Sequence, residues 1–253
     1  MLIYAVTSFD KRFRQEFQNV KNVKANNLFS FYDKTAVNQY SFIKSISKNI
    51  LIDSGAFSIF NSNPNVNFDK YFEGYCKFVE SLTNDEIIKG FFELDIGALI
   101  SYEKVLYYRN RLDEVSDKII PVWHLYLGVE EFKKMVQKYD YISIGGIVSK
   151  EINKNKLAPY VKYAHKHNTK IHGLGITTQK ILDTVPFDSV DSSSWLLSRF
   201  GQMYCFDKGK SYAKKIKSKY ISDGYGKINV MSYLNFLKFQ EYYYNKWKFY
   251  HND

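Results

Sequence analysis

Residues 49–57 read NILIDSGAF, an apolar run that ends in an Asp-Ser-Gly turn, and this stretch decides the fold. Apolar residues at successive positions, rather than alternate ones, are typical of a parallel strand that is covered on both faces. Residues 68–82 then carry apolar side chains three and four positions apart, which places them on one face of a helix. The stretch therefore predicts a strand followed by a helix, the repeating unit of α/β proteins.

The same alternation continues along the chain in both directions. Strands are expected at residues 2–6, 50–53, 90–95, 119–124, 141–144, 170–173 and 189–191, and further helices at 157–167 and 211–220. Alternating strands and helices over this length form either a closed barrel or an open doubly wound sheet. Because no GxGxxG follows the first strand, we expect a TIM-type (β/α)8 barrel, with an irregular eighth unit around residues 203–206.

The end of the sequence, residues 228–250, contains neither Gly nor Pro and predicts one long helix rich in aromatic side chains. We expect most of these rings to pack on the barrel, although the interleaved Lys238, Lys246 and Lys248 would also suit a nucleic-acid surface. Nearer the middle of the chain, residues 107–111 (YYRNR) read as a solvated helix face with apolar anchors.

Length and composition indicate a single domain over residues 1–253. Of the 253 residues, 45% are hydrophobic, enough for one large core. The apolar runs are too short to cross a bilayer and no signal-peptide pattern is present, so we expect a cytoplasmic protein without a membrane partner. The two cysteines, Cys76 and Cys205, lie in no metal-binding pattern, so we expect no metal site.

The charge balance favours a polyanionic partner. Thirty-six Lys and Arg against 26 Asp and Glu give a net charge of +10, and only five of the cations are Arg. Lysine makes point contacts to phosphate and is less suited than Arg to reading bases, so the excess is typical of backbone attraction. A merely solvated lysine-rich surface would give the same balance.

Polar residues and glycines stand at the ends of most predicted strands. They include Asp53, Asp95 and Asp191, and in a βα barrel such strand ends meet at the mouth where active sites are built. Neighbouring carboxylates supply both an acid and a nucleophile, the combination used for substitution at an anomeric carbon. The glycine pairs at 145–146 and 173–175 allow a close approach to a flat ligand. Asp188, three residues before Asp191, is expected to point elsewhere and to be structural.

The order DSGAF, ELD, IGG, HGLG and DSVDS resembles that of the tRNA-guanine transglycosylase family. Barrels of that family carry DSGGFQ, FDEC, GGLAVGE, GVG and a DMFDC-like or DLFDS-like strand in the same sequence. The resemblance covers about residues 50–200. It implies a TIM-type barrel that exchanges a guanine through a covalent glycosyl-enzyme, with no cofactor.

The resemblance also implies a role for each residue that matches a family motif. Asp191 corresponds to the nucleophile, and Asp53 to the residue that transfers a proton and contacts the base. The implied substrate-binding residues are Asp95 at the guanine edge, Gly145 and Gly146 against the base, Gly173 and Gly175, Ser54 and Phe57 of the DSGAF motif, and His124, which stands where the family has a Gln on the base carbonyl. Phe57 and Trp195 would either flank the base or pack in the core.

The sequence also departs from the family. Ser58 replaces the Gln of DSGGFQ, and the family's C-terminal zinc site of three Cys and one His has no counterpart. The chain is most similar to the short phage-type DNA 7-deazaguanine transglycosylases, which exchange guanine in DNA for a deazapurine such as preQ0. The implied partners are DNA, guanine and a free 7-deazaguanine base in a bacterial or phage-infected cell.

Three alternatives stay open. The same chemistry would act on tRNA, or the barrel would bind nucleic acid without catalysis, or the enzyme would be a plain glycosidase. The sequence does not set the oligomeric state.

Overall fold

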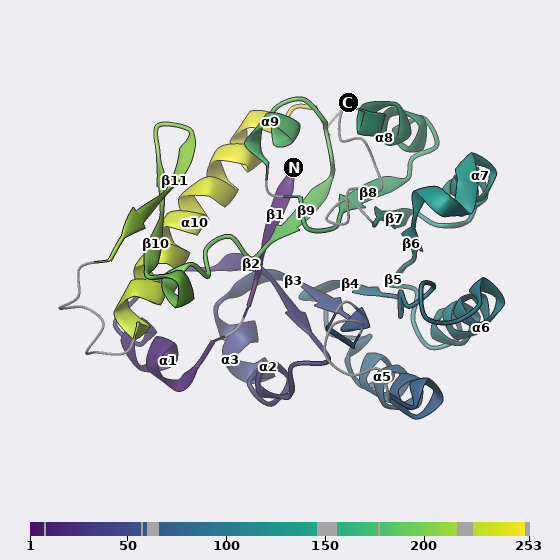
Figure 1. Ribbon diagram of the computed structural model, residues 1–253, viewed down its shortest axis with the longest axis horizontal. Helices are drawn as coiled ribbons and strands as arrows, with labels where there is room; N and C mark the ends of the chain where they lie inside the picture. Colours follow the sequence, from purple (N-terminus) through teal and green to yellow (C-terminus); the bar gives the residue numbers. More distant parts are fainter. Residues whose placement is uncertain are drawn as a thin grey trace.

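The computed structural model describes residues 1–7, 9–56, 58–59, 66–145, 156–176, 178–216 and 225–250. Within these ranges, parallel strands form one sheet in the order β5-β4-β3-β2-β1-β9-β8-β7-β6, and helices surround it (Figure 1). The sheet strands are β1 (Leu2–Val6), β2 (Ala25–Ser30), β3 (Ser47–Asp53), β4 (Ile88–Phe92), β5 (Ile119–Ile120), β6 (Val122–Trp123), β7 (Tyr141–Ile144), β8 (Lys170–Gly173) and β9 (Ser189–Ser192). The α/β fold of a nearly closed TIM-type barrel is confirmed.

The two ends of the sheet meet around Pro121, which separates β5 from β6. β5 pairs with β4 on one side, and β6 pairs with β7 on the other. Proline has no backbone N–H, so it interrupts the ladder at this point. The single strand predicted at residues 119–124 is therefore two short strands, and together they join the ends of the barrel.

β2 is a barrel strand that sequence analysis did not predict. It reads ANNLFS, and asparagine is depleted in strands because its side chain competes for backbone hydrogen bonds. In the fold the Asn27 amide is satisfied, since it donates to Ser47 Oγ at 2.8 Å and accepts from the Tyr233 hydroxyl at 2.7 Å. β2 supplies the missing unit between β1 and β3, so the eighth unit predicted around residues 203–206 is wrong.

Residues 203–206 belong instead to an antiparallel hairpin of β10 (Gln202–Asp207) and β11 (Lys210–Lys215), which lies outside the barrel sheet. The helix predicted at 211–220 is wrong over its first half, which is β11, and residues 217–220 lie outside the described residues. Tyr204 and Phe206 of β10 are buried against the rings of Phe236 and Phe239. The hairpin therefore packs on the protein through one of its two faces, the face that carries Tyr204 and Phe206.

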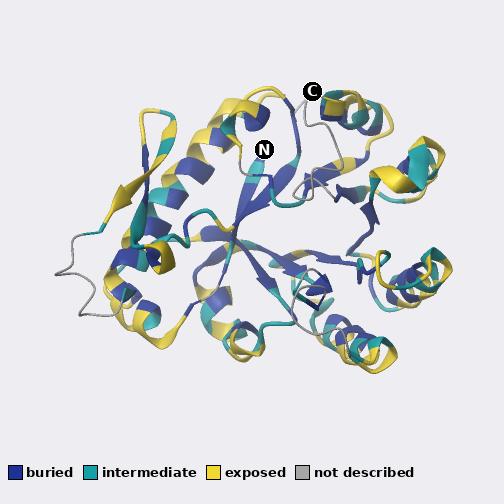
Figure 2. Ribbon diagram, in the orientation of Figure 1, coloured by how far each residue is buried: buried dark blue, intermediate teal, exposed yellow. Residues whose placement is uncertain are grey.

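The helices present their buried faces to the barrel and their exposed faces to solvent, as Figure 2 shows. They are α1 (Lys11–Phe17), α2 (Lys34–Asn38), α3 (Tyr40–Ser45), α5 (Phe68–Leu82), α6 (Tyr102–Asp113), α7 (Gly128–Lys138), α8 (Leu157–His165), α9 (Gln179–Leu182) and α10 (Gly226–Trp247), with 3-10 turns η1 (Leu125–Leu127) and η3 (Ser198–Phe200). α5 has its predicted bounds. None of the described helices is both long and apolar enough to cross a membrane.

The predicted C-terminal helix is α10, and its aromatic residues serve mainly to pack it on the barrel. The ring of Tyr233 lies in a cluster with Phe9, Phe13 and Trp195, at centroid distances of 5.2–5.6 Å from them. Gln240 pairs with the backbone of Asn26, accepting from its N–H at 3.1 Å and donating to its carbonyl at 2.9 Å. The aromatic residues of this helix that stay exposed include Tyr242 and Tyr244.

Candidate active site

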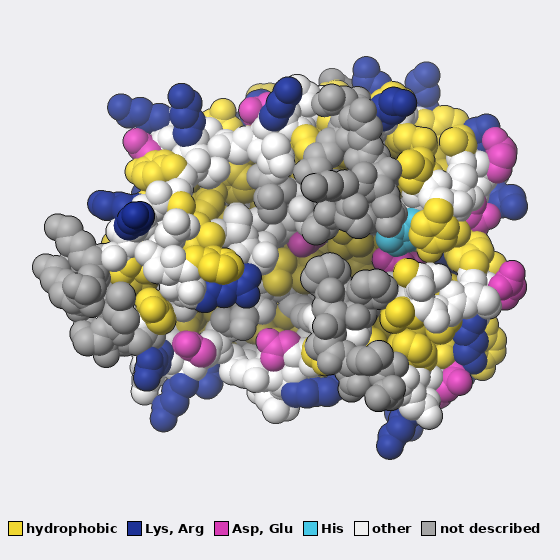
Figure 3. Space-filling view, viewed as in Figure 1, with side chains coloured by type: hydrophobic (Ala, Val, Ile, Leu, Met, Phe, Trp, Pro, Cys, Tyr) yellow, Lys and Arg dark blue, Asp and Glu magenta, His cyan; other side chains and the backbone are white. Residues whose placement is uncertain are grey.

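The three predicted carboxylates lie at the same mouth of the barrel. Asp53 is the last residue of β3, Asp191 lies in β9 near its end, and Asp95 follows β4 by three residues. Because all barrel strands are parallel, these positions share one end. In line with this shared position, the charges of Asp191 and Asp95 both raise the pKa of Asp53. Figure 3 shows carboxylate and histidine side chains together in a hollow on this face.

Asp191 is held through one oxygen and open at the other. Its Oδ1 accepts from the Gly175 N–H at 2.7 Å and lies 3.1 Å from His172 Nε2. An ionised carboxylate only accepts, so a charged Asp191 requires the hydrogen of this contact to lie on Nε2. No hydrogen bond from the described residues reaches Oδ2. The carboxylate is therefore fixed in orientation while one oxygen stays available to a ligand.

His172 lies beneath Asp191 and is fully buried in β8. Its Nδ1 is 2.5 Å from Ser189 Oγ, and Ser189 in turn bonds the hydroxyl of Tyr141. These hydrogen bonds through Ser189 and Tyr141 fix the orientation of the His172 imidazole. In the sequence, the HGLG segment stands out for its glycines, although a histidine inside an apolar strand is itself a signal of a buried polar network.

Asp53 is the carboxylate with the most perturbed pKa. Burial raises its pKa to about 6, and the charges of Asp191 and Asp95 act in the same direction. Hydrogen bonds from Ser30 and from the Gly55 N–H oppose this shift without cancelling it. Asp53 therefore exchanges a proton near neutral pH, as a general acid or base requires.

Asp95 pairs with His124 across the mouth. His124 Nε2 lies 2.8 Å from both carboxylate oxygens, and the imidazole stacks on Tyr126 at 5.3 Å between centroids. The ring also lies close to Gly145, where a Cβ would stand 2.7 Å from His124 Cε1. Gly145 thus makes room for His124 within the protein, and any contact of its backbone with a base stays a prediction.

A buried ion pair fixes the strands that carry Asp95 and His124. The Glu93 carboxylate accepts from Arg109 Nε at 2.7 Å and Nη2 at 3.0 Å, and from the Val122 N–H at 2.5 Å. The last bond links the end of β4 to β6 just past Pro121, where the backbone ladder is interrupted. Arg109, expected on a solvated helix face, is instead buried, and this expectation is wrong.

The remaining predicted site residues take varied positions. The Ser54 hydroxyl donates to the Glu93 carbonyl at 2.7 Å, so it fastens two loops of the mouth. Gly173 closes β8, and a Cβ there would meet Ile176 at 2.4 Å. Gly175 has a φ of +66°, which suits glycine and aims its N–H at Asp191. Phe57 and Gly146 lie outside the described residues.

Trp195, which would either flank the base or pack in the core, and Asp188, which was expected to be structural, both have structural roles. Trp195 is fully buried and its Nε1 donates to the Val6 carbonyl at 3.0 Å, so it packs in the core. Asp188 accepts from the Ile171 N–H at 2.7 Å, where β8 begins, and lies 2.8 Å from His165 Nε2. It is therefore at the opposite end of the barrel from Asp191.

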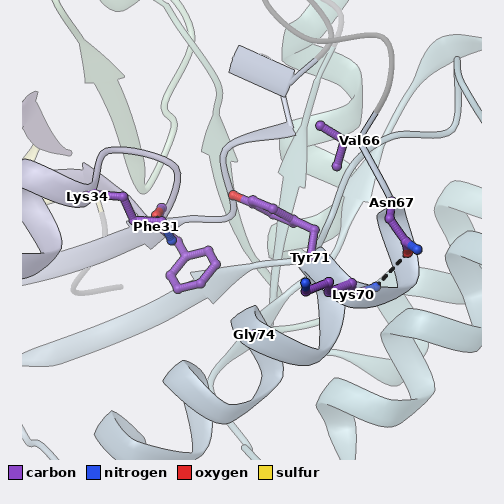
Figure 4. Close-up of a pocket in the computed structure, with 7 residues that line it drawn as sticks. All are labelled: Phe31, Lys34, Val66, Asn67, Lys70, Tyr71 and Gly74. Atoms are coloured by element: carbon purple, nitrogen blue, oxygen red, sulfur yellow. Dashed lines mark hydrogen bonds between the residues drawn. The ribbon is translucent and has the colours of Figure 1, made fainter.

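A cavity of about 310 Å³ lies beside the mouth, between the loop after β2 and the start of α5 (Figure 4). Its lining residues are Phe31, Lys34, Val66, Asn67, Lys70, Tyr71 and Gly74. The Tyr71 hydroxyl donates to the Ser54 carbonyl at 2.7 Å, and burial together with the Asp53 charge raises the pKa of this phenol. Tyr71 therefore stands between the cavity and Asp53, and none of the three carboxylates lines the cavity.

Among the described residues, no group of three or more His, Cys, Asp and Glu side chains has a metal-binding arrangement. No protein-family model matches the chain, and comparison with curated proteins gives no significant match. The case for function therefore rests on the geometry of the mouth and on the motifs of the sequence.

Proposed function

We propose that this chain is a guanine transglycosylase that exchanges a guanine in DNA for a 7-deazaguanine base such as preQ0. The observation that carries the proposal is the pair of unlike carboxylates at one mouth. Asp191 is fixed through Oδ1 with Oδ2 open, and Asp53 has a pKa of about 6. A held nucleophile beside a proton carrier is the arrangement that covalent substitution at an anomeric carbon requires.

The chemistry uses only these two groups and the two bases. Asp191 Oδ2 forms a bond to C1′ of the nucleotide while the bond from C1′ to the guanine nitrogen breaks, and Asp53 gives its proton to the departing guanine. The incoming deazapurine then loses a proton to Asp53 as its nitrogen attacks C1′ and the ester to Asp191 breaks. Atoms and charges balance without a cofactor or an energy source.

The base would be held on the side of the mouth formed by Asp95 and His124. These two groups bond each other at 2.8 Å, so a purine edge replaces this contact with bonds of its own. A duplex base cannot reach a barrel mouth while it is stacked, so the target nucleotide is flipped out or single-stranded.

The test follows incorporation of radiolabelled guanine into DNA and, in parallel, tRNA. Wild-type protein is compared with Asp191→Asn and with Asp117→Asn, which removes an exposed carboxylate after α6. We expect exchange into DNA by wild type and Asp117→Asn, no exchange by Asp191→Asn, and a covalent protein–DNA adduct on denaturing gels. Exchange by Asp191→Asn would refute the nucleophile, and exchange into tRNA alone would move the proposal to RNA. Polymer binding with no exchange by wild type would leave a non-catalytic barrel.

A further inference from the structure

The hairpin has one face turned away from the protein. In its register Tyr204 lies opposite Ala213 and Phe206 opposite Ser211, and the two aromatic residues pack on α10. Because side chains alternate along a strand, Lys210, Tyr212 and Lys214 share the other face. All three are exposed, and Tyr212 is 52% exposed. We name these three residues the outer stripe.

The hairpin and the turn before it carry an unbalanced positive charge. Residues 198–216 contain Arg199, Lys208, Lys210, Lys214 and Lys215 but only one carboxylate, Asp207. No ion pair among the described residues involves any of these five cations. Lys and Arg side chains gather over β10 and β11 in Figure 3. Asp207 lies opposite Lys210 in the register and offsets part of this charge, but the surface keeps an excess of cations that can receive anions.

The hairpin is fastened on the mouth side of the barrel. Gln179, the first residue of α9, donates to the Gly209 carbonyl at 2.8 Å and accepts from the Ser211 N–H at 2.9 Å. α9 begins four residues after Gly175, which holds Asp191. Nine residues separate the end of β9 from the start of β10, so the hairpin follows closely after the strand of Asp191. Figure 1 shows it projecting beside the barrel.

We propose that the outer stripe binds the backbone of a single-stranded polynucleotide, with a phosphate at each lysine and a base stacked on Tyr212. The two lysines are four residues apart on an extended strand, which separates them by about 13 Å and leaves the ring between them. A ring flanked by cations is the arrangement that binds single strands without regard to sequence. The proposal rests on the proposed function for its choice of polymer.

The test measures binding of a fluorescent 15-nucleotide single-stranded DNA by anisotropy at several salt concentrations. The variant Lys210→Gln/Lys214→Gln is compared with Lys162→Gln/Lys166→Gln, which removes the same charge from exposed positions on and just after α8. We expect the stripe variant to weaken binding about tenfold and to lower the salt slope by about one per lysine. Tyr212→Ala should weaken binding about fivefold or more while leaving the salt slope unchanged.

Two results would overturn the inference. Equal losses in the two lysine pairs would mean that net charge alone binds DNA, and unchanged binding by the stripe variant would mean that these lysines only protect an exposed strand edge from aggregation. Because the assay reads binding and not exchange, it stands apart from the proposed function. If the wild-type protein binds DNA through the outer stripe but exchanges no base, this inference is supported and the proposed transglycosylase function is refuted.

Discussion

Replacing Arg109 with methionine removes one half of an ion pair that is almost fully buried. The side chains of Arg109 and Glu93 are 4% and 1% exposed, and Glu93 accepts three hydrogen bonds, of which only the one from the Val122 N–H would remain. Loss of one partner of a buried pair costs about 3–5 kcal/mol, because the other charge is left uncompensated. In a domain of this size that cost lowers the unfolding temperature by about 6–20 °C.

Thermal and urea unfolding, followed by circular dichroism, measure this cost. Arg111→Met is the matched control. It breaks the exposed pair of Arg111 and Glu114 at the end of the same helix and should barely change the unfolding midpoint. The double variant Glu93→Gln/Arg109→Met carries no buried charge and keeps an acceptor for Val122, so it should recover much of the loss. A single-variant cost below about 1 kcal/mol, typical of an exposed pair, would refute the claim that the buried pair of Glu93 and Arg109 fixes this part of the barrel.

Three further substitutions test other contacts. Asp53→Asn should stabilise the protein at pH 8 by up to about 3 kcal/mol, because the folded pKa of about 6 lies above the unfolded value of 3.8, and the gain should vanish below pH 4. The unfolding midpoints of both proteins are measured from pH 4 to pH 8. A stabilisation that does not change with pH would contradict the raised pKa of Asp53. Gln240→Ala leaves both backbone groups of Asn26 unpaired and should cost about 2–5 kcal/mol in urea unfolding. Gly145→Ala places a Cβ against His124 and should cost about 1–3 kcal/mol, and an NMR spectrum with unmoved histidine signals would argue against that contact.

The sequence was sufficient for the parts of the fold that follow local pattern. The apolar runs of β1, β3, β7 and β8 and the periodicity of α5 predict these elements, because their side chains meet the core on a regular repeat. β2 does not follow its local pattern. Its asparagines are stabilised by Tyr233 and Gln240, more than 200 residues away, and such distant partners cannot be read from a window of sequence.

The candidate site divides in the same way. Asp53, Asp95 and Asp191 were found because strand ends in a barrel converge, which is a property of the fold and not of local sequence. His172 and Glu93 were missed because their importance depends on their neighbours across the sheet. In the sequence, Glu93 lies two residues before Asp95 and resembles another carboxylate of the mouth. Only the structure shows that Glu93 is paired with Arg109.

Asp53 differs from the other two carboxylates of the mouth in its hydrogen-bonding neighbours, because Asp95 and Asp191 each lie beside a histidine. Carboxylates at one barrel mouth repel each other when charged, and Asp95 and Asp191 each lie within hydrogen-bonding distance of an imidazole Nε2, at 2.8 Å and 3.1 Å respectively. Among the described residues Asp53 has only neutral hydrogen-bond donors, so burial and repulsion raise its pKa. The arrangement therefore makes Asp53 the carboxylate that takes up a proton near neutral pH, which is the role that the proposed exchange assigns to it.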